Sequence, residues 1–331
     1  MSHPAALANG DLVVRLIERQ VRSLVDWHVP VLADKDPEPL HQMRVSLRKL
    51  RVTLVQFEPL LRLGEPLSCR PLIKTGRRLG LARDLDVLQA RLHDQLLPQL
   101  PAAEVALLQP VLRQLRRERQ QAHEQACEQL RRSSYLSWLA QMQRWLRHPR
   151  LTPLAGDPLA DWLPQWQLGW MATLFVHPAW RFEQLREERQ REQLHELRKQ
   201  IKTARYQLDN CKPLLGRRSR EAISGFKQMQ ELLGELNDLQ VLQRALDDQW
   251  PGALVSDLPQ LHGLLQQGEA DCWQQWRALA QRQSGAQAYQ QLLGALQRDR
   301  QRAWLQRRSM ALCSSLQRAV FCDWRTVLQH R

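Results

Sequence analysis

Apolar residues recur along the chain at helical spacing, and prolines interrupt the pattern. Met43, Leu47 and Leu50 lie three or four positions apart, which places them on one face of a helix. No run of alternating β-branched and aromatic residues predicts a strand, so we expect an all-α fold. With prolines as boundaries, the pattern predicts helices over about residues 11–29, 40–59, 66–97, 110–149, 159–177, 180–212, 218–250, 257–283 and 286–331.

The helix predicted to end near Pro59 also carries like charges on one face. His41, Arg44, Arg48 and Arg51 follow one another at spacings of three, four and three residues, and we call them the first basic stripe. Like charges at such spacings repel by roughly 0.2–0.5 kcal/mol per pair. At about 100° per residue, the stripe lies about 110° round the helix from the apolar face. The cations therefore border the core, where they would face a groove or a seam.

A second basic stripe with the same spacing begins 154 positions after the first. It consists of His195, Arg198, Lys202 and Arg205. The segment LGLARDLDVL at residues 79–88 recurs, also 154 positions later, as LGELNDLQVL at 233–242. Two separate motifs at one offset predict two copies of one supersecondary unit. Two facing stripes of cations would repel unless an anion lay between them.

The repeat predicts how the chain is divided. The segment RHPRLTPLAGDP at residues 147–158 is the best internal boundary because it interrupts the helical pattern with prolines and a glycine. We expect a first helical repeat over residues 1–150, a second over 151–285 and a basic helical C-terminal extension over 286–331, with about four helices in each repeat.

Composition narrows the choice of partner. The 331 residues include 48 Lys and Arg against 34 Asp and Glu, for a formal net charge of +14. This excess favours nucleic acid, an anionic membrane or polyphosphate, although an arginine-rich proteome would give the same balance.

Other sequence features favour a cytoplasmic protein with no membrane partner. The N-terminus lacks the pattern of a signal peptide, and the longest apolar stretch, residues 168–176, is too short to span a bilayer. The six cysteines lack paired metal spacing, so we expect core thiols in a reducing compartment.

The duplicated motifs resemble those of the CHAD domain, the conserved histidine α-helical domain, over about residues 11–285. The pattern HxxRVxxRxxR followed by LGxxRDLDVL is closely matched in the first copy and more loosely in the second. The resemblance implies two tandem four-helix bundles related by a pseudo-twofold axis, with a basic central cavity. It also implies binding of inorganic polyphosphate and association with polyphosphate granules. Some relatives carry a triphosphatase domain with an ExExK signature, which this sequence does not contain.

We therefore predict non-catalytic binding of polyphosphate in a channel lined by both repeats. Lys74 and Lys227 are further candidate contacts beside the motifs. The predicted polyphosphate-binding residues are His41, Arg44, Arg48, Arg51, Lys74, His195, Arg198, Lys202, Arg205 and Lys227.

Two other classes of function are weaker. The alternative that the protein binds nucleic acid is supported by its charge alone. An enzyme is disfavoured because the sequence offers no nucleophile–base pair and no glycine-rich phosphate loop. Asp84 and Asp238 are the acids kept in both copies, too few for a metal site, so we expect no metal and no cofactor and assign them to holding neighbouring arginines.

Overall fold

The computed structural model describes residues 7–185, 187–250 and 252–328, and these residues form helices joined by turns. The all-α prediction is confirmed, and the only β pairings within the described residues are two isolated bridges. The α-helices are α1 (Asn9–Asp26), α2 (His28–Ala33), α3 (Glu38–Gln56), α4 (Arg70–Arg91), α5 (Ala102–Arg131), α6 (Ser133–Arg147), α7 (Gln165–Leu174), α8 (Glu188–Asn210), α9 (Arg217–Gln249), α10 (Leu254–Asp257), α11 (Pro259–Gln283) and α12 (Gly285–Leu328).

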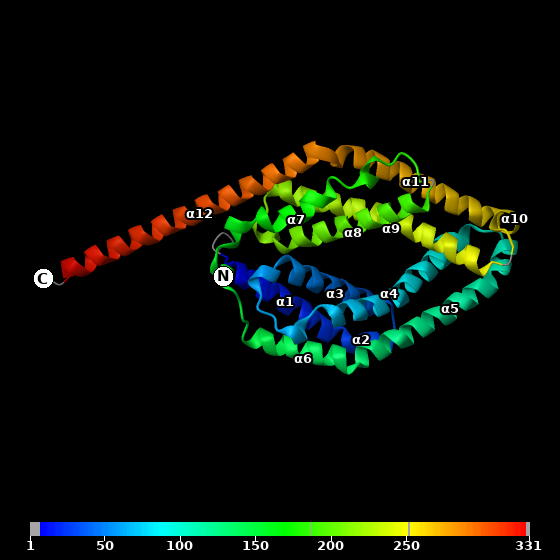
Figure 1. Ribbon diagram of the computed structural model, residues 1–331, viewed down its shortest axis with the longest axis horizontal. Coiled ribbons are helices and arrows are strands. Elements are labelled where there is room, and N and C mark those ends of the chain that lie inside the picture. The colour runs from blue at the N-terminus through cyan, green and yellow to red at the C-terminus, as the bar shows by residue number, and fades with distance from the viewer. Residues whose placement is uncertain (1–6, 186, 251, 329–331) are drawn as a thin grey trace.

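The helices lie in two halves, with α1–α6 on one side and α7–α12 on the other (Figure 1). In the first half α1 packs on α3 and α4 on α5, while in the second half α7 packs on α8 and α9 on α11. The halves meet where α3 contacts α8 and α4 contacts α9, and we call this interface the seam. Because α3 and α8 carry the two basic stripes, both stripes belong to helices of the seam.

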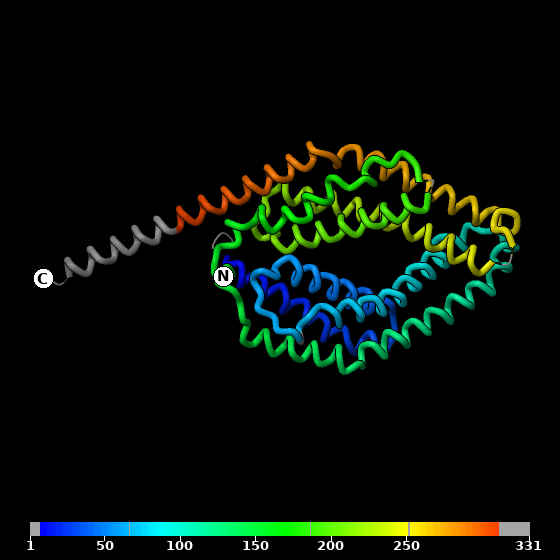
Figure 2. Tube along the Cα trace, viewed as in Figure 1, coloured from blue at the N-terminus to red at the C-terminus, as the bar shows by residue number. Residues whose placement is uncertain are grey.

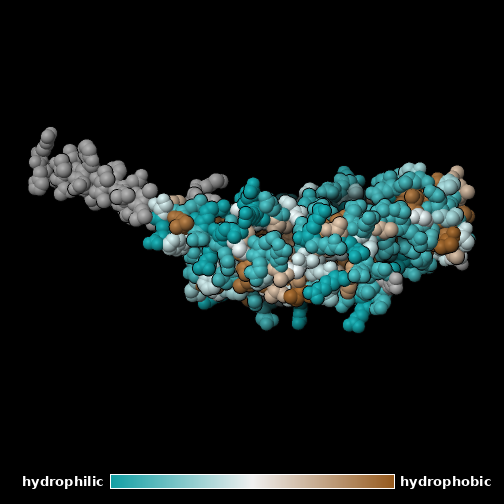
Figure 3. All heavy atoms as spheres, turned by 90° about the horizontal axis from the view of Figure 1, so that it is seen from above, coloured by the Kyte–Doolittle hydropathy of each residue, from teal (hydrophilic) through white to brown (hydrophobic). Residues whose placement is uncertain are grey.

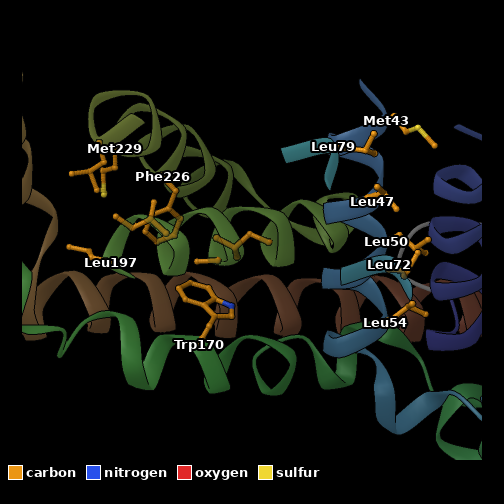
Figure 4. Packing of buried hydrophobic residues seen from close by; sticks show 14 of the residues in the cluster. Met43, Leu47, Leu50, Leu54, Leu72, Leu79, Trp170, Leu197, Phe226 and Met229 are labelled. Carbon is orange, nitrogen blue, oxygen red and sulfur yellow. The ribbon is translucent and has the colours of Figure 1, made fainter. Parts of the chain in front are cut away.

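The apolar faces of α3 and α8 form part of the core, as the spacing predicts. Figure 4 shows the labelled side chains in two groups, one around α3 and α4 and the other around Trp170 and Phe226. Burial of apolar surface on this scale is the main force that holds each helix in place. At most 3% of each of the following residues is exposed: Met43, Leu47, Leu50, Leu54, Leu197, Ile201, Ala204 and Leu208.

Prolines mark the helix ends less strictly than predicted. Pro30 is the third residue of α2, where the missing N–H has no partner within the helix in any case. Pro110 lies inside α5, which begins at Ala102. Leu108 and Val111 on either side of it are buried, so packing outweighs the lost hydrogen bond. The break between α5 and α6 falls at Arg132, whose backbone is extended although no proline is nearby.

The first part of α12 resembles α6 in its packing. Four of its buried or partly buried residues lie 154 positions after buried residues of α6, and Figure 2 shows it following the outer side of the second half. We therefore propose that the second repeat continues into α12 as far as Ala303, beyond the predicted boundary at 285. The corresponding pairs are Tyr135 and Tyr289, Trp138 and Leu292, Leu139 and Leu293, and Met142 and Leu296.

Hydrophilic side chains cover most of the face drawn in Figure 3, with hydrophobic ones scattered among them. Within the part of the chain that the structure describes, every helix is too short or too polar to cross a bilayer.

Candidate anion-binding site

The seam brings together the middle of both basic stripes. Arg44 and Arg48 come from α3, and Arg198 and Lys202 come from α8. Their charges act on one another between the halves, since Arg198 lowers the pKa of Arg44 and Arg48 lowers the pKa of Arg198, in both cases after desolvation by burial. We call these four side chains the cation cluster.

Lys202 is the most perturbed member of the cluster. Burial lowers the pKa of its ammonium to about 6, and the charges of Arg48, Arg198 and Arg44 contribute in the same direction. Asp238 acts in the opposite direction, but no described carboxylate lies within 4.0 Å of the Lys202 ammonium. A pKa of about 6 favours the neutral amine of Lys202 at neutral pH.

Each half supports its central arginine in a similar way. The Arg44 guanidinium lies 3.6 Å from Asp84 Oδ1 and donates to the carbonyl of Gly76 at 3.4 Å. It crosses α4 directly over Gly80, where a Cβ atom would overlap Nη1. Arg198 crosses α9 over Gly234, where a Cβ would lie 3.6 Å from Nη2. Each arginine thus lies over the glycine 36 residues later, in the LG pair that begins the second motif of each repeat, but only at Gly80 does the absence of a side chain make room for the guanidinium.

The Nε atom of Arg198 is buried and has no hydrogen-bond partner in the structure. A buried guanidinium N–H without an acceptor is costly, and an anion bound at the seam would satisfy it.

Hydrogen bonds fix the orientation of the His195 ring. Asn237 donates from Nδ2 to Asp238 Oδ1 at 3.2 Å, which turns its amide oxygen toward His195 Nδ1 at 2.8 Å. Since an amide oxygen only accepts, Nδ1 carries the hydrogen and Nε2 is free to take up a proton. Burial lowers the pKa of His195, although the bond to Asn237 opposes the shift.

His41 occupies the equivalent position but has a different neighbour. Burial lowers its pKa, and the next largest cause is the charge of Arg83, the counterpart of Asn237. Both histidines are thus held toward the neutral form while the site is empty.

The remaining predicted residues lie outside the cation cluster. Arg51, Lys74 and Lys227 are exposed, and the Lys227 ammonium lies 3.5 Å from Glu231. Arg205 donates to Gln230 Oε1 at 3.0 Å and lies over the Tyr206 ring at 4.3 Å. These four residues stay predicted contacts for a longer ligand.

A buried polar contact that sequence reasoning missed joins α3 to α8 about two helical turns beyond the cluster. Asn210 Nδ2 donates to Gln56 Oε1 at 2.8 Å and to Thr53 Oγ1 at 3.2 Å, and Gln56 donates to the Gln207 carbonyl. Gln56 and Asn210 are again 154 positions apart. A polar residue that recurs at the equivalent position of both apolar faces could have indicated this contact from the sequence.

At another point of the seam, Arg91 of α4 forms an ion pair with Glu235 of α9. These contacts fix how the two halves face each other.

Open surface hollows lie elsewhere in the described residues. One of about 640 Å³ borders the start of α9, and one of about 720 Å³ lies along α5. Their linings include no stripe residue, so the candidate site is defined by the convergence of charge rather than by a closed pocket.

The fold and the cation cluster define an all-helical protein in which two repeated motifs converge on one strongly positive seam. The CHAD domain family model matches residues 15–247, so the chain belongs to the CHAD domain family, whose known role is polyphosphate binding.

Two solved structures are similar to this chain. The crystal structure of the CHAD domain from the plant Ricinus communis has a TM-score of 0.63 and 24% sequence identity, covering 84% of this chain and 93% of that one. PptA from Streptomyces chartreusis has a TM-score of 0.59 and 19% identity, covering 83% of this chain and 99% of that one. At these identities the likeness shows the shared fold alone. No curated protein matches the sequence.

Proposed function

We propose that the chain binds linear inorganic polyphosphate at the seam, through both basic stripes at once, and does not hydrolyse it. The observation that carries this proposal is the convergence of Arg44 and Arg48 with Arg198 and Lys202 from the other half. Cations from two elements that repel in the empty protein are stabilised when a polyanion lies between them.

The chemistry of the side chains suits phosphate. The planar guanidinium holds two phosphate oxygens at once, and this geometry favours arginine wherever phosphate is recognised. Successive residues of a stripe lie about one helical turn apart, roughly 5.4 Å along the axis. A linear chain of phosphates meets them in succession, whereas a compact anion reaches only neighbours.

The surroundings of Asp84 support a water-filled channel at the seam. Two-thirds of its side-chain surface is accessible to water, yet desolvation by the surrounding protein raises the pKa of its carboxyl. A side chain on a concave wet surface has both properties, because water reaches it while protein surrounds it. We propose that the ligand lies in this concavity, and that binding brings the protein to polyphosphate granules in the cytoplasm.

Nucleic acid is the alternative ligand, and a titration separates the two. At one salt concentration, we expect long polyphosphate to bind far more tightly than orthophosphate or double-stranded DNA, since a duplex is too wide for a seam between two helices. The affinity should fall steeply as salt is added, because binding displaces counterions. Incubation of polyphosphate with the protein, with or without Mg²⁺, should release no orthophosphate beyond the amount released without the protein. Equal affinity for orthophosphate and long chains would rule out the channel.

The close approach of Arg44 to Gly80 gives a second test. In Gly80→Ala, the new methyl group displaces the Arg44 guanidinium, so we expect polyphosphate affinity to fall several-fold. Stability should not fall, because alanine in a helix interior is favoured over glycine by roughly 0.5–1 kcal/mol. Gly234→Ala is the matched control, since its methyl group makes only an ordinary contact with Arg198. Calorimetric titration of both variants measures the difference, and equal losses would show that the position of Arg44 is not what matters.

A further inference from the structure

Each half places a carboxylate among the cations of the seam. Asp84 Oδ1 lies 3.6 Å from the Arg44 guanidinium, and the charge of Asp238 opposes the lowering of the Arg198 pKa. The two acids are 154 positions apart, as are the two arginines. Asp238 also acts on Asp84 from the opposite half, so both carboxylates border the same space.

Acids in this place work against the proposed function, on which the present inference rests. A carboxylate repels every phosphate that approaches the cluster. If affinity alone mattered, a neutral amide of the same shape would hold the arginine and leave the ligand unopposed. The presence of an acid at the equivalent position of both halves therefore calls for an explanation besides affinity.

The contact between Asp84 and Arg44 is loose. Elsewhere in the first half, Arg119 is held firmly, with Nε 2.8 Å from Asp86 Oδ1 and Nη2 2.6 Å from Asp34 Oδ1. The 3.6 Å separation at Arg44 is longer, and the Asp84 side chain is two-thirds exposed. A stronger anion can replace such a partner without unfolding its surroundings.

We propose that Asp84, together with Asp238 at the equivalent position, determines specificity for chain length. The Asp84 carboxylate is a tethered competitor that lies 3.6 Å from the Arg44 guanidinium until a long polyanion displaces it. A single phosphate competes against a carboxylate that is permanently at high effective concentration. The phosphates of one chain are themselves linked, so a chain that reaches cations of both halves gains the same advantage. Short anions are excluded, and a minimum chain length follows.

Carboxylate-to-amide variants test this proposal on the full chain. Asp84→Asn and Asp238→Asn, singly and together, are titrated with orthophosphate, pyrophosphate and long polyphosphate at one pH and salt concentration. We expect the double variant to bind pyrophosphate about tenfold more tightly than the wild type and to gain less affinity for long chains. The ratio of the affinities for long polyphosphate and pyrophosphate should therefore fall. Asp94→Asn is the control, since it removes the same charge from an exposed residue. Asp94→Asn should leave the ratio of affinities for long and short anions unchanged.

Several outcomes would overturn the proposal. Weaker binding of every anion would mean that the acids only hold the arginines in place, and an equal gain at every length would mean that they lower affinity without selecting. If a variant unfolds at a lower temperature than the wild type, the single variant that retains wild-type stability decides between these outcomes. A wild-type protein without preference for long chains would instead refute the proposed function, together with this refinement of it.

Discussion

Replacing Arg44 or Arg198 with alanine is expected to weaken polyphosphate binding at least tenfold in each case, and by similar factors. The two arginines occupy equivalent positions, and each lies over the glycine of an LG motif. Hydrogen bonds to charged groups contribute about 1.5–3 kcal/mol each, which corresponds to roughly tenfold or more in affinity. Calorimetric titration with long polyphosphate gives both values directly. Arg48→Ala and Lys202→Ala extend the comparison to the second equivalent pair.

Lys49→Ala is the control for these variants. Lys49 lies on α3 beside Arg48, and its side chain lies about 100° round the helix from that of Arg48, away from the stripe. Its replacement should change affinity little. None of the stripe variants should lose stability, because replacing an arginine removes repulsion between like charges and replacing Lys202 removes a buried amine whose pKa is lowered in the folded protein. If Arg44 and Arg48 prove essential while Arg198 and Lys202 contribute nothing, the ligand lies on the first half alone.

Binding is also expected to take up protons and to weaken as the pH rises above about 6. In the empty site burial lowers the Lys202 pKa to about 6, whereas a bound phosphate stabilises the ammonium and raises its pKa toward the ordinary 10.5. Between these values the complex holds more protons than the free protein, so affinity should fall by up to about tenfold per pH unit. Below pH 6 Lys202 is charged in both the free protein and the complex, so it no longer contributes to the pH dependence of the affinity.

His41 and His195 extend the proton uptake to lower pH. Burial lowers both of their pKa values from 6.5, so a bound polyanion favours their protonation below that value. Titrations in two buffers with different ionisation enthalpies count the protons. In Lys202→Met, a variant without this amine, the dependence above pH 6 should flatten. An unchanged slope would show that Lys202 does not contact the ligand.

The lowered pKa of Lys202 makes the stability of the protein without ligand increase with pH, whereas the affinity for polyphosphate decreases. Between about pH 6 and 10.5 the unfolded chain binds a proton at Lys202 that the folded chain does not. The free energy of unfolding therefore rises with pH over this range. Lys202 is thus destabilising near neutral pH, which fits a residue retained for binding.

Sequence periodicity was sufficient to predict most of the helices and the two stripes whose middle residues converge. The apolar positions of α3 and α8 repeat at helical spacing, and the basic positions border them, so burial of one set places the other at the edge of the core. The 154-residue offset by itself pairs Arg44 with Arg198.

The rest depends on packing between the halves, which no local pattern encodes. The depth at which Lys202 is buried follows from the contact of α3 with α8, and the passage of Arg44 over Gly80 follows from the distance between α3 and α4. Helix ends were also misplaced, because tertiary burial carries α5 through Pro110. The beginning of α12 is related to α6 by packing together with the 154-residue offset, which the motifs that predict a boundary at 285 do not reach.

The central claim is that one polyphosphate chain is held by both halves. A crystal structure of the protein with a short polyphosphate tests it most directly. We predict a single chain along the seam between α3 and α8, with its oxygens in contact with Arg44 and Arg48 on one side and with Arg198 and Lys202 on the other. A chain bound to one half alone, or to the outer faces of α5 or α12, would contradict the account.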